Sequence, residues 1–257
     1  MRITNQQRQM AKLLRLQSLR IGRTYAPKLA AARRRELARV LGFADSYDPK
    51  DWPTKLPAKI NEKYLRSWYE NMFIGVGMPV ARTTVNNFLS RKAENDMWHE
   101  ALNGWINKNA GRKVKIISNG FKDWFTGALK EAIKDQTMSI EQLTQQLSGN
   151  IMSVYEGVQE WEIRRIVQTE SLTALSVAQD ESIKALGIPY TKTWVISGNN
   201  TRPAHLEMDG VTIDEDELFE ISIDGFTEYM LYPRDDSNGA SAANIINCAC
   251  TVFMSPK

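Results

Sequence analysis

The hydrophobic period of this chain changes once, near Gly187 and Pro189, and this change constrains the fold more than any other feature. Before it, apolar residues recur at the three- and four-residue spacing of amphipathic helices. After it, residues 190–196 alternate and are rich in Thr, Trp, Val and Ile, as a strand is. Shorter strands are expected at 219–223, 229–232 and 251–254. The sequence therefore predicts a predominantly helical α+β protein with a small C-terminal β-containing module.

The first forty residues are predicted to form a basic helical arm. Met10, Leu13, Leu14 and Leu16 give this helix a broad apolar stripe, and Gly42 supplies a C-terminal stop. Residues 43–57 then contain three prolines together with Asp and Ser, which disfavours regular structure and predicts a linker. The arm and linker make up the first predicted domain, residues 1–57.

A helical middle region is predicted for residues 58–150, before a C-terminal α+β module at 151–257. From Ile60 to Met72 every fourth residue is apolar or aromatic, Trp68 among them, so this helix should bury one face. Its predicted end is the glycine and proline cluster at 75–79. Further helices are expected at 83–105, 121–133, 139–149 and 158–186, the last being the longest, with a loop or hairpin at 107–115.

Charge is strongly polarised along the chain. Residues 1–40 hold 11 Lys or Arg against one acid, residues 41–150 hold 15 against 12, and residues 151–257 hold 7 against 17. The basic end therefore suits a polyanion or an acidic partner surface, while a solvated helix face is the alternative. The residues expected to contact DNA phosphates are Arg15, Arg20, Arg23, Lys28, Arg33, Arg34, Arg35 and Arg39.

The sequence gives no sign of a membrane or of an oxidising compartment. It has no window of 18 apolar residues, and Lys12 and Arg15 interrupt the N-terminal leucines before a signal-peptide core forms. The chain is therefore expected to stay in the cell that makes it. Cys248 and Cys250 are one residue apart, a spacing too strained for an ordinary disulfide.

Residues that can carry chemistry gather in the C-terminal module. His205 and Asp209 follow the first strand, and Cys248 and Cys250 lie near the C-terminus. An imidazole, two thiolates and a carboxylate suit tetrahedral zinc, and residues four apart on a helical turn point the same way. One alternative is a cluster of small buried cysteines beside a hydrogen-bonded histidine. The other is a Cys-His nucleophilic pair oriented by Asp209.

Several short motifs occur in unbroken order between residues 119 and 257. They are Arg165 with Thr169 and Glu170, Lys192 with Trp194, Thr201 and Arg202 with His205, Asp209 and Gly210, Tyr232 with Pro233, and finally Asn247, Cys248, Ala249 and Cys250. As an ordered set they resemble the C-terminal module of phage head morphogenesis proteins, the minor head proteins of the phage Mu F type. That family has an arginine where this chain has Ala249.

The resemblance implies a non-enzymatic protein of the virion, inside the capsid near the portal vertex, which is made in the host cytoplasm. Its implied partners are the portal protein, the inner capsid surface and the packaged genome, which the basic arm would contact. Thr169, Glu170, Trp194, Arg202, Gly210 and Asn247 are then structural motif residues. The rival hypotheses are a hydrolase or transferase that uses a Cys-His pair, and a cellular nucleic-acid-binding protein.

Overall fold

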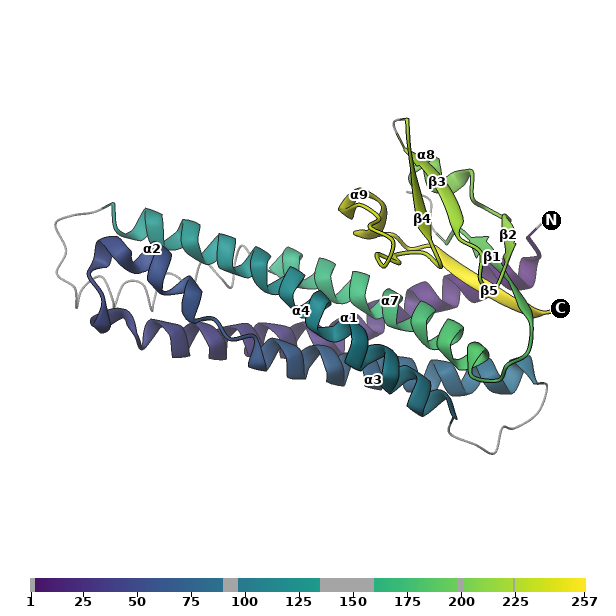
Figure 1. Ribbon diagram of the computed structural model, residues 1–257, viewed down its shortest axis with the longest axis horizontal. Coiled ribbons are helices and arrows are strands. Elements are labelled where there is room, and N and C mark those ends of the chain that lie inside the picture. The colour runs from purple at the N-terminus through teal and green to yellow at the C-terminus, as the bar shows by residue number, and fades with distance from the viewer. Residues whose placement is uncertain (1–2, 90–96, 135–159, 198–200, 224) are drawn as a thin grey trace. The chain divides into compact units, whose positions relative to one another are not determined.

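The computed structural model describes residues 3–89, 97–134, 160–197, 201–223 and 225–257 (Figure 1). The long helices come first: α1 (Asn5–Leu41), α3 (Lys63–Phe88), α4 (Met97–Ala132) and α7 (Glu160–Lys184). Within these described ranges, strands follow only after α7, so the predicted class, a predominantly helical α+β protein, is confirmed. No described helix combines the length and the apolar character that a membrane crossing requires.

Short elements complete the fold. Between α1 and α3 lie η1 (Ala44–Ser46), η2 (Pro49–Asp51), α2 (Trp52–Lys55) and η3 (Pro57–Lys59). After α7 come β1 (Tyr190–Val195), α8 (Pro203–Leu206), β2 (Thr212–Asp214), β3 (Phe219–Ile223), β4 (Phe226–Met230), α9 (Ala242–Ile245) and β5 (Thr251–Pro256). The strands predicted at 190–196 and 219–223 are confirmed, β4 begins earlier than predicted, and β2 was not predicted.

The chain forms two compact units, and each unit is built from separate segments. Unit 1 consists of Met1–Thr24, Met72–Ile106 and Arg165–Lys257, and unit 2 of Tyr25–Asn71 and Asn107–Arg164. Each long helix therefore contributes to both units. The predicted domains, 1–57, 58–150 and 151–257, instead follow chain order.

In unit 2, the segment predicted as a linker is part of the core. The Trp52 side chain is fully buried, and its indole N–H donates to the carbonyls of Ala44 at 3.0 Å and Tyr47 at 3.1 Å. Each proline of the segment lies in the first turn of a short helix, where the missing N–H costs no hydrogen bond. The linker prediction is therefore wrong, because these prolines start helices instead of preventing them.

Two predicted helix breaks are also wrong. Helix α3 continues through the cluster at 75–79, and α4 continues through 107–115. In unit 1, a Cβ atom on Gly77 would lie 2.8 Å from Leu102 Cδ2, so this glycine allows α3 and α4 to approach closely.

The predicted helix at 83–105 corresponds to the end of α3 and the start of α4, and the one predicted at 139–149 lies outside the described residues. The longest described helix is α1, with 37 residues, where the sequence predicted the helix at 158–186.

The first part of the predicted N-terminal arm, up to Thr24, packs within unit 1. Leu14 and Ser18 of α1 are buried, whereas Leu13 and Leu16 of the predicted apolar stripe are more than half exposed. Arg15 Nη1 donates to the carbonyl of Ser197 at 3.2 Å. Residues 5–24 therefore belong to the same compact unit as the C-terminal module.

The strands form two small antiparallel sheets. The first has the order β2-β1-β5, and its register pairs Lys192 with Ile213 of β2 and with Met254 of β5. The second consists of β3 and β4. The first strand is attached to α7, because the buried hydroxyl of Tyr190 donates to Asp180 at 2.7 Å. In Figure 1 these strands carry the green and yellow colours of the C-terminal end.

Candidate metal centre

The three central side chains of the candidate site come from two short segments of unit 1. Pro203 begins α8, whose single turn directs the His205 ring into the interior. Cys250 immediately precedes β5, and Cys248 lies in the turn before it, where Asn247 has a φ of 58°. His205 and both cysteines are each at most 2% exposed.

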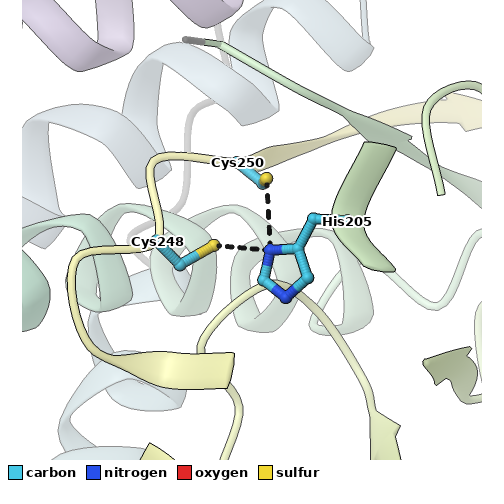
Figure 2. A group of neighbouring side chains, drawn as sticks. All are labelled: His205, Cys248 and Cys250. Atoms are coloured by element: carbon cyan, nitrogen blue, oxygen red, sulfur yellow. Dashed lines mark hydrogen bonds between the residues drawn. The ribbon is translucent and has the colours of Figure 1, made fainter. Parts of the chain in front are cut away.

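These side chains point toward one another (Figure 2). His205 Nδ1 lies 3.5 Å from Cys248 Sγ and 3.6 Å from Cys250 Sγ. One ligand atom of each residue lies within 4.8 Å of the others, so the group is able to hold a metal ion. In a tetrahedral zinc site with Zn–N near 2.0 Å and Zn–S near 2.3 Å, nitrogen and sulfur lie about 3.5 Å apart. The donor set and its spacing therefore fit zinc.

A second layer of polar residues holds the far side of the imidazole. His205 Nε2 is 2.8 Å from Asn244 Oδ1, and Asn244 Nδ2 donates to Glu228 Oε2 at 2.6 Å. The backbone N–H of Ser241 donates to the same carboxylate oxygen at 2.9 Å. Burial alone would raise the pKa of Glu228, but these hydrogen bonds outweigh it and lower that pKa. Glu228 is therefore an ionised acceptor.

Arg234 holds the cysteine segment against α7. Its Nη1 donates to the carbonyls of Cys248 at 3.0 Å and Cys250 at 2.5 Å, and its Nη2 donates to Leu172 O at 3.0 Å and Ser176 Oγ at 2.8 Å. Its side chain is fully buried, and its φ is 72°. Burial lowers the pKa of Arg234. Its guanidinium is nevertheless a cation, and Nη1 lies 3.8 Å from Cys248 Sγ.

The two thiols are electrostatically unequal. A hydrogen bond from Cys250, together with those involving His205 and the charge of Arg234, lowers the pKa of Cys248 well below its usual range. The same hydrogen bond raises the pKa of Cys250, and burial adds to the effect. Of the two thiols, Cys248 therefore loses its proton more readily, and a bound cation would also have to displace the proton of Cys250.

Asp209 does not complete the ligand set that the sequence predicted. Its Oδ1 accepts the Ile196 N–H at 3.1 Å, and its Oδ2 pairs with Arg8 of α1 at 2.9 Å. The prediction assumed one helical turn from His205 to Asp209, but α8 ends at Leu206. Asp209 instead connects α1 to the segment after β1.

The other predicted motif residues hold the cysteine segment and the end of β1. Thr169 Oγ1 on α7 accepts the N–H of Asn247 at 3.3 Å, and Arg202 Nη2 donates to Ile246 O. Glu170, next to Thr169, is buried and favours the charged form of Arg234.

Trp194 packs its ring edge to face with His205, with the ring centroids 5.4 Å apart. Gly210 donates its N–H to Trp194 O at 2.9 Å with a φ of 89°, a conformation that favours glycine.

The predicted DNA-contacting residues divide into exposed and enclosed groups. Arg33 is 2% exposed, lies 3.5 Å from Glu162 and stacks on the ring of Phe121, so it cannot reach DNA. Arg34 and Arg39 are half-buried, and Arg39 pairs with Glu36 at 2.5 Å. The exposed residues of the predicted set are Arg15, Arg20, Arg23, Lys28 and Arg35.

Sequence reasoning missed three residues of this site: Glu228, Asn244 and Arg234. Arg234 directly follows the Tyr232-Pro233 motif, and this neighbourhood was the available signal for it. Glu228 on β4 and Asn244 on the short helix α9 carry no comparable signal, because acidic and amide side chains are most often solvated.

Comparisons with known proteins add one distant relative. The chain is 27% identical over 154 residues to "Uncharacterized protein YqbB" of Bacillus subtilis (strain 168). The match covers 54% of this chain and 49% of that protein, so the chain spans about half the length of this relative. No protein-family model and no solved structure matches the chain.

Proposed function

We propose that this chain is a phage minor head protein that acts in head morphogenesis, associated with the portal inside the capsid. One observation carries the proposal: several of the ordered motif residues that resemble the phage Mu F type contact the same segment of unit 1, the one that leads into the cysteines. Thr169 and Arg202, far apart in the sequence, hold Asn247 and Ile246 of the segment that leads into the cysteines. This convergence supports treating the motif set as one module.

The basic face of α1 supports a role close to packaged DNA. Arg20, Arg23 and Lys28 are exposed on a segment that carries 11 Lys or Arg against one acid over residues 1–40. Cations on an exposed helix neutralise phosphates and release counterions without reading sequence. In this proposal α1 contacts the genome while the acidic C-terminal module faces protein.

We further propose that the ion of the candidate metal centre is zinc and that its role is structural. Two sulfur donors and one imidazole nitrogen suit Zn²⁺ better than the oxygen-preferring Mg²⁺ or Ca²⁺. When bound, zinc would tie the single-turn helix α8 to the segment before β5 and contribute its binding free energy to folding. Elemental analysis and X-ray absorption of the purified chain test this, with two sulfur ligands expected.

The burial of the cysteines argues against the enzyme hypothesis. A nucleophilic cysteine has to reach its substrate, but Cys248 and Cys250 are each 2% exposed. Slow reaction of the native chain with iodoacetamide is expected, whereas rapid labelling would favour a catalytic thiolate.

The head-protein proposal is tested on particles. Phage particles released from the strain that encodes this chain are purified and analysed by mass spectrometry, and the chain is co-expressed with the portal protein of the same genome. We expect the chain in DNA-filled heads at low copy and in a complex with the portal protein. Absence from particles, together with normal heads after deletion of its gene, would refute the proposal.

A further inference from the structure

The hydrogen bonds behind His205 determine which of its ring nitrogens carries a proton. A neutral imidazole has one N–H donor and one acceptor nitrogen, and the partner of one nitrogen fixes the state of the other. Here Nε2 lies 2.8 Å from the amide oxygen of Asn244, and Nδ1 faces the two sulfur atoms.

The orientation of the Asn244 amide follows from Glu228. An ionised carboxylate accepts hydrogen bonds and donates none, so the group 2.6 Å from Glu228 Oε2 must be the NH₂ of Asn244. The amide oxygen then faces His205, and Nε2 must be the donor. In the neutral ring, Nδ1 is then the unprotonated nitrogen, and its lone pair faces Cys248 and Cys250.

This arrangement is held from several directions. Asn244 is completely buried on α9, and Glu228 on β4 also accepts the Ser241 N–H that precedes α9. If Glu228 were apolar, nothing in this chain of contacts would prevent the Asn244 amide from turning over. Its NH₂ would then favour an acceptor at Nε2 and a proton at Nδ1, between the sulfur atoms.

We infer that Glu228 and Asn244 are positioning residues that hold His205 in the tautomer whose unprotonated Nδ1 faces the two cysteines. The purpose of this tautomer rests on the proposed zinc site, because only an unprotonated nitrogen binds a metal. Residues in such outer positions typically change metal affinity about 10- to 100-fold when they are replaced.

The tautomer is measured directly by NMR on the full chain with ¹⁵N-labelled histidine. The chain has two histidines, so the ring spectra are simple, and exposed His99 on α4 serves as the internal reference. Without added metal we expect the His205 signals of the Nε2–H tautomer. An Nδ1–H tautomer in the unmodified chain would overturn the inference, even if no variant folds.

The variants distinguish a positioning role of Glu228 and Asn244 from a general effect on stability. Glu228→Leu and Asn244→Leu should shift His205 toward the Nδ1–H form and weaken zinc binding about 10- to 100-fold. Glu228→Gln keeps an oxygen acceptor for Ser241 and Asn244, so it should retain the tautomer. Glu220→Leu, the same change at an exposed position of β3, is the matched control and should alter neither.

The two proposals fail in distinguishable ways. An unchanged His205 tautomer in folded Glu228→Leu and Asn244→Leu would overturn the positioning roles, whatever the metal result. An unmodified chain that shows the Nε2–H tautomer but binds neither Zn²⁺ nor Co²⁺ would refute the zinc site while supporting the tautomer assignment.

Discussion

Arg234 Nη1 donates to the backbone carbonyl of Cys248 over 3.0 Å, entirely within the protein interior. The same guanidinium also donates to Leu172 of α7. One side chain thus satisfies carbonyls of two segments, which the hydrogen bond from the Asn247 N–H to Thr169 Oγ1 also joins. The cysteine segment is therefore held by a cation from a third segment, whether or not a metal binds.

Replacement of Arg234 should destabilise the chain severely. Arg234→Leu would leave the carbonyls of Cys248, Cys250 and Leu172 unpaired in the interior, and we expect a loss of about 3 to 5 kcal/mol in the free energy of unfolding. Urea denaturation measures this loss. The exposed Arg20→Leu is the control and should change stability by less than about 0.5 kcal/mol. Equal effects of the two changes would contradict the role assigned to Arg234.

Metal removal should lower stability through the His205 cluster. We expect about one zinc per chain and a melting temperature that falls when a strong chelator is added. In Cys248→Ser, the melting temperature should be low already and insensitive to the chelator. If the unmodified chain contains no metal and Cys248→Ser still melts early, the cluster is held by hydrogen bonds, as the alternative from the sequence proposes.

Tyr190 should make stability fall at high pH. Burial and the adjacent Asp180 raise the pKa of Tyr190 above its usual value of about 10, so the hydroxyl stays protonated in the folded chain while the unfolded chain ionises. Its stabilising contribution is therefore complete below pH 10 and is lost as the pH rises further, by about 1.4 kcal/mol per pH unit. Tyr190→Phe should reduce this slope between pH 10 and 12, as urea unfolding would measure.

The control for Tyr190 is the exposed Tyr229→Phe, which should leave the alkaline slope unchanged. At neutral pH, Tyr190→Phe should cost about 1 to 3 kcal/mol, because Asp180 loses one hydrogen-bond donor. A Tyr190→Phe chain with the full alkaline slope would show that the buried hydroxyl does not titrate as described.

Exposed and buried arginines of α1 should affect DNA binding differently. Arg20→Ala and Arg23→Ala should each lower the slope of log K against log salt by about 0.9 on duplex DNA if each side chain neutralises one phosphate. Arg33→Ala should leave that slope unchanged and destabilise the fold, because the Arg33 side chain is 2% exposed. Filter binding across salt concentrations measures these slopes. A changed slope for Arg33→Ala would contradict this division.

Two glycines inside long helices should respond oppositely to alanine. Gly77→Ala would force Leu102 out of its place, at a cost of about 1 to 3 kcal/mol. Gly104→Ala in α4 meets nothing within 4 Å and should stabilise the chain by about 0.5 to 1 kcal/mol through helix propensity. Thermal melts compare them, and a stabilising Gly77→Ala would show that the Leu102 side chain can move aside at little cost.

Local sequence patterns correctly predicted the elements that are determined by interactions between neighbouring residues. The β-branched and aromatic alternation from Tyr190 onward specified β1, because it suits a pleated surface. The predictions at Gly77 and at the prolines near Trp52 were wrong. In the sequence alone, a glycine in a close helix contact or a proline in a first helical turn cannot be told from one that ends a helix. Only the packing around them distinguishes the two uses.

The candidate site was partly predictable for a related reason. His205, Cys248 and Cys250 are rare residue types in this chain, and their grouping in the C-terminal module is by itself a sign of chemistry. Arg234, Asn244 and Glu228 are common types, and their roles depend on contacts between segments that the sequence does not bring together. The assignment of Asp209 as a ligand was wrong because it assumed a helical turn from His205 to Asp209, whereas α8 ends at Leu206.

The composition of unit 1 has a consequence for the order in which the protein is made. Residues 1–24 leave the ribosome before residues 165–257, yet these later residues are among their partners within the unit, and Arg8 pairs with Asp209. At about 5 to 20 residues per second, the first helix waits on the order of ten seconds for those partners. During synthesis residues 1–24 therefore stay without these partners until residues 165–257 have emerged, so unit 1 forms only after the C-terminal segment is made.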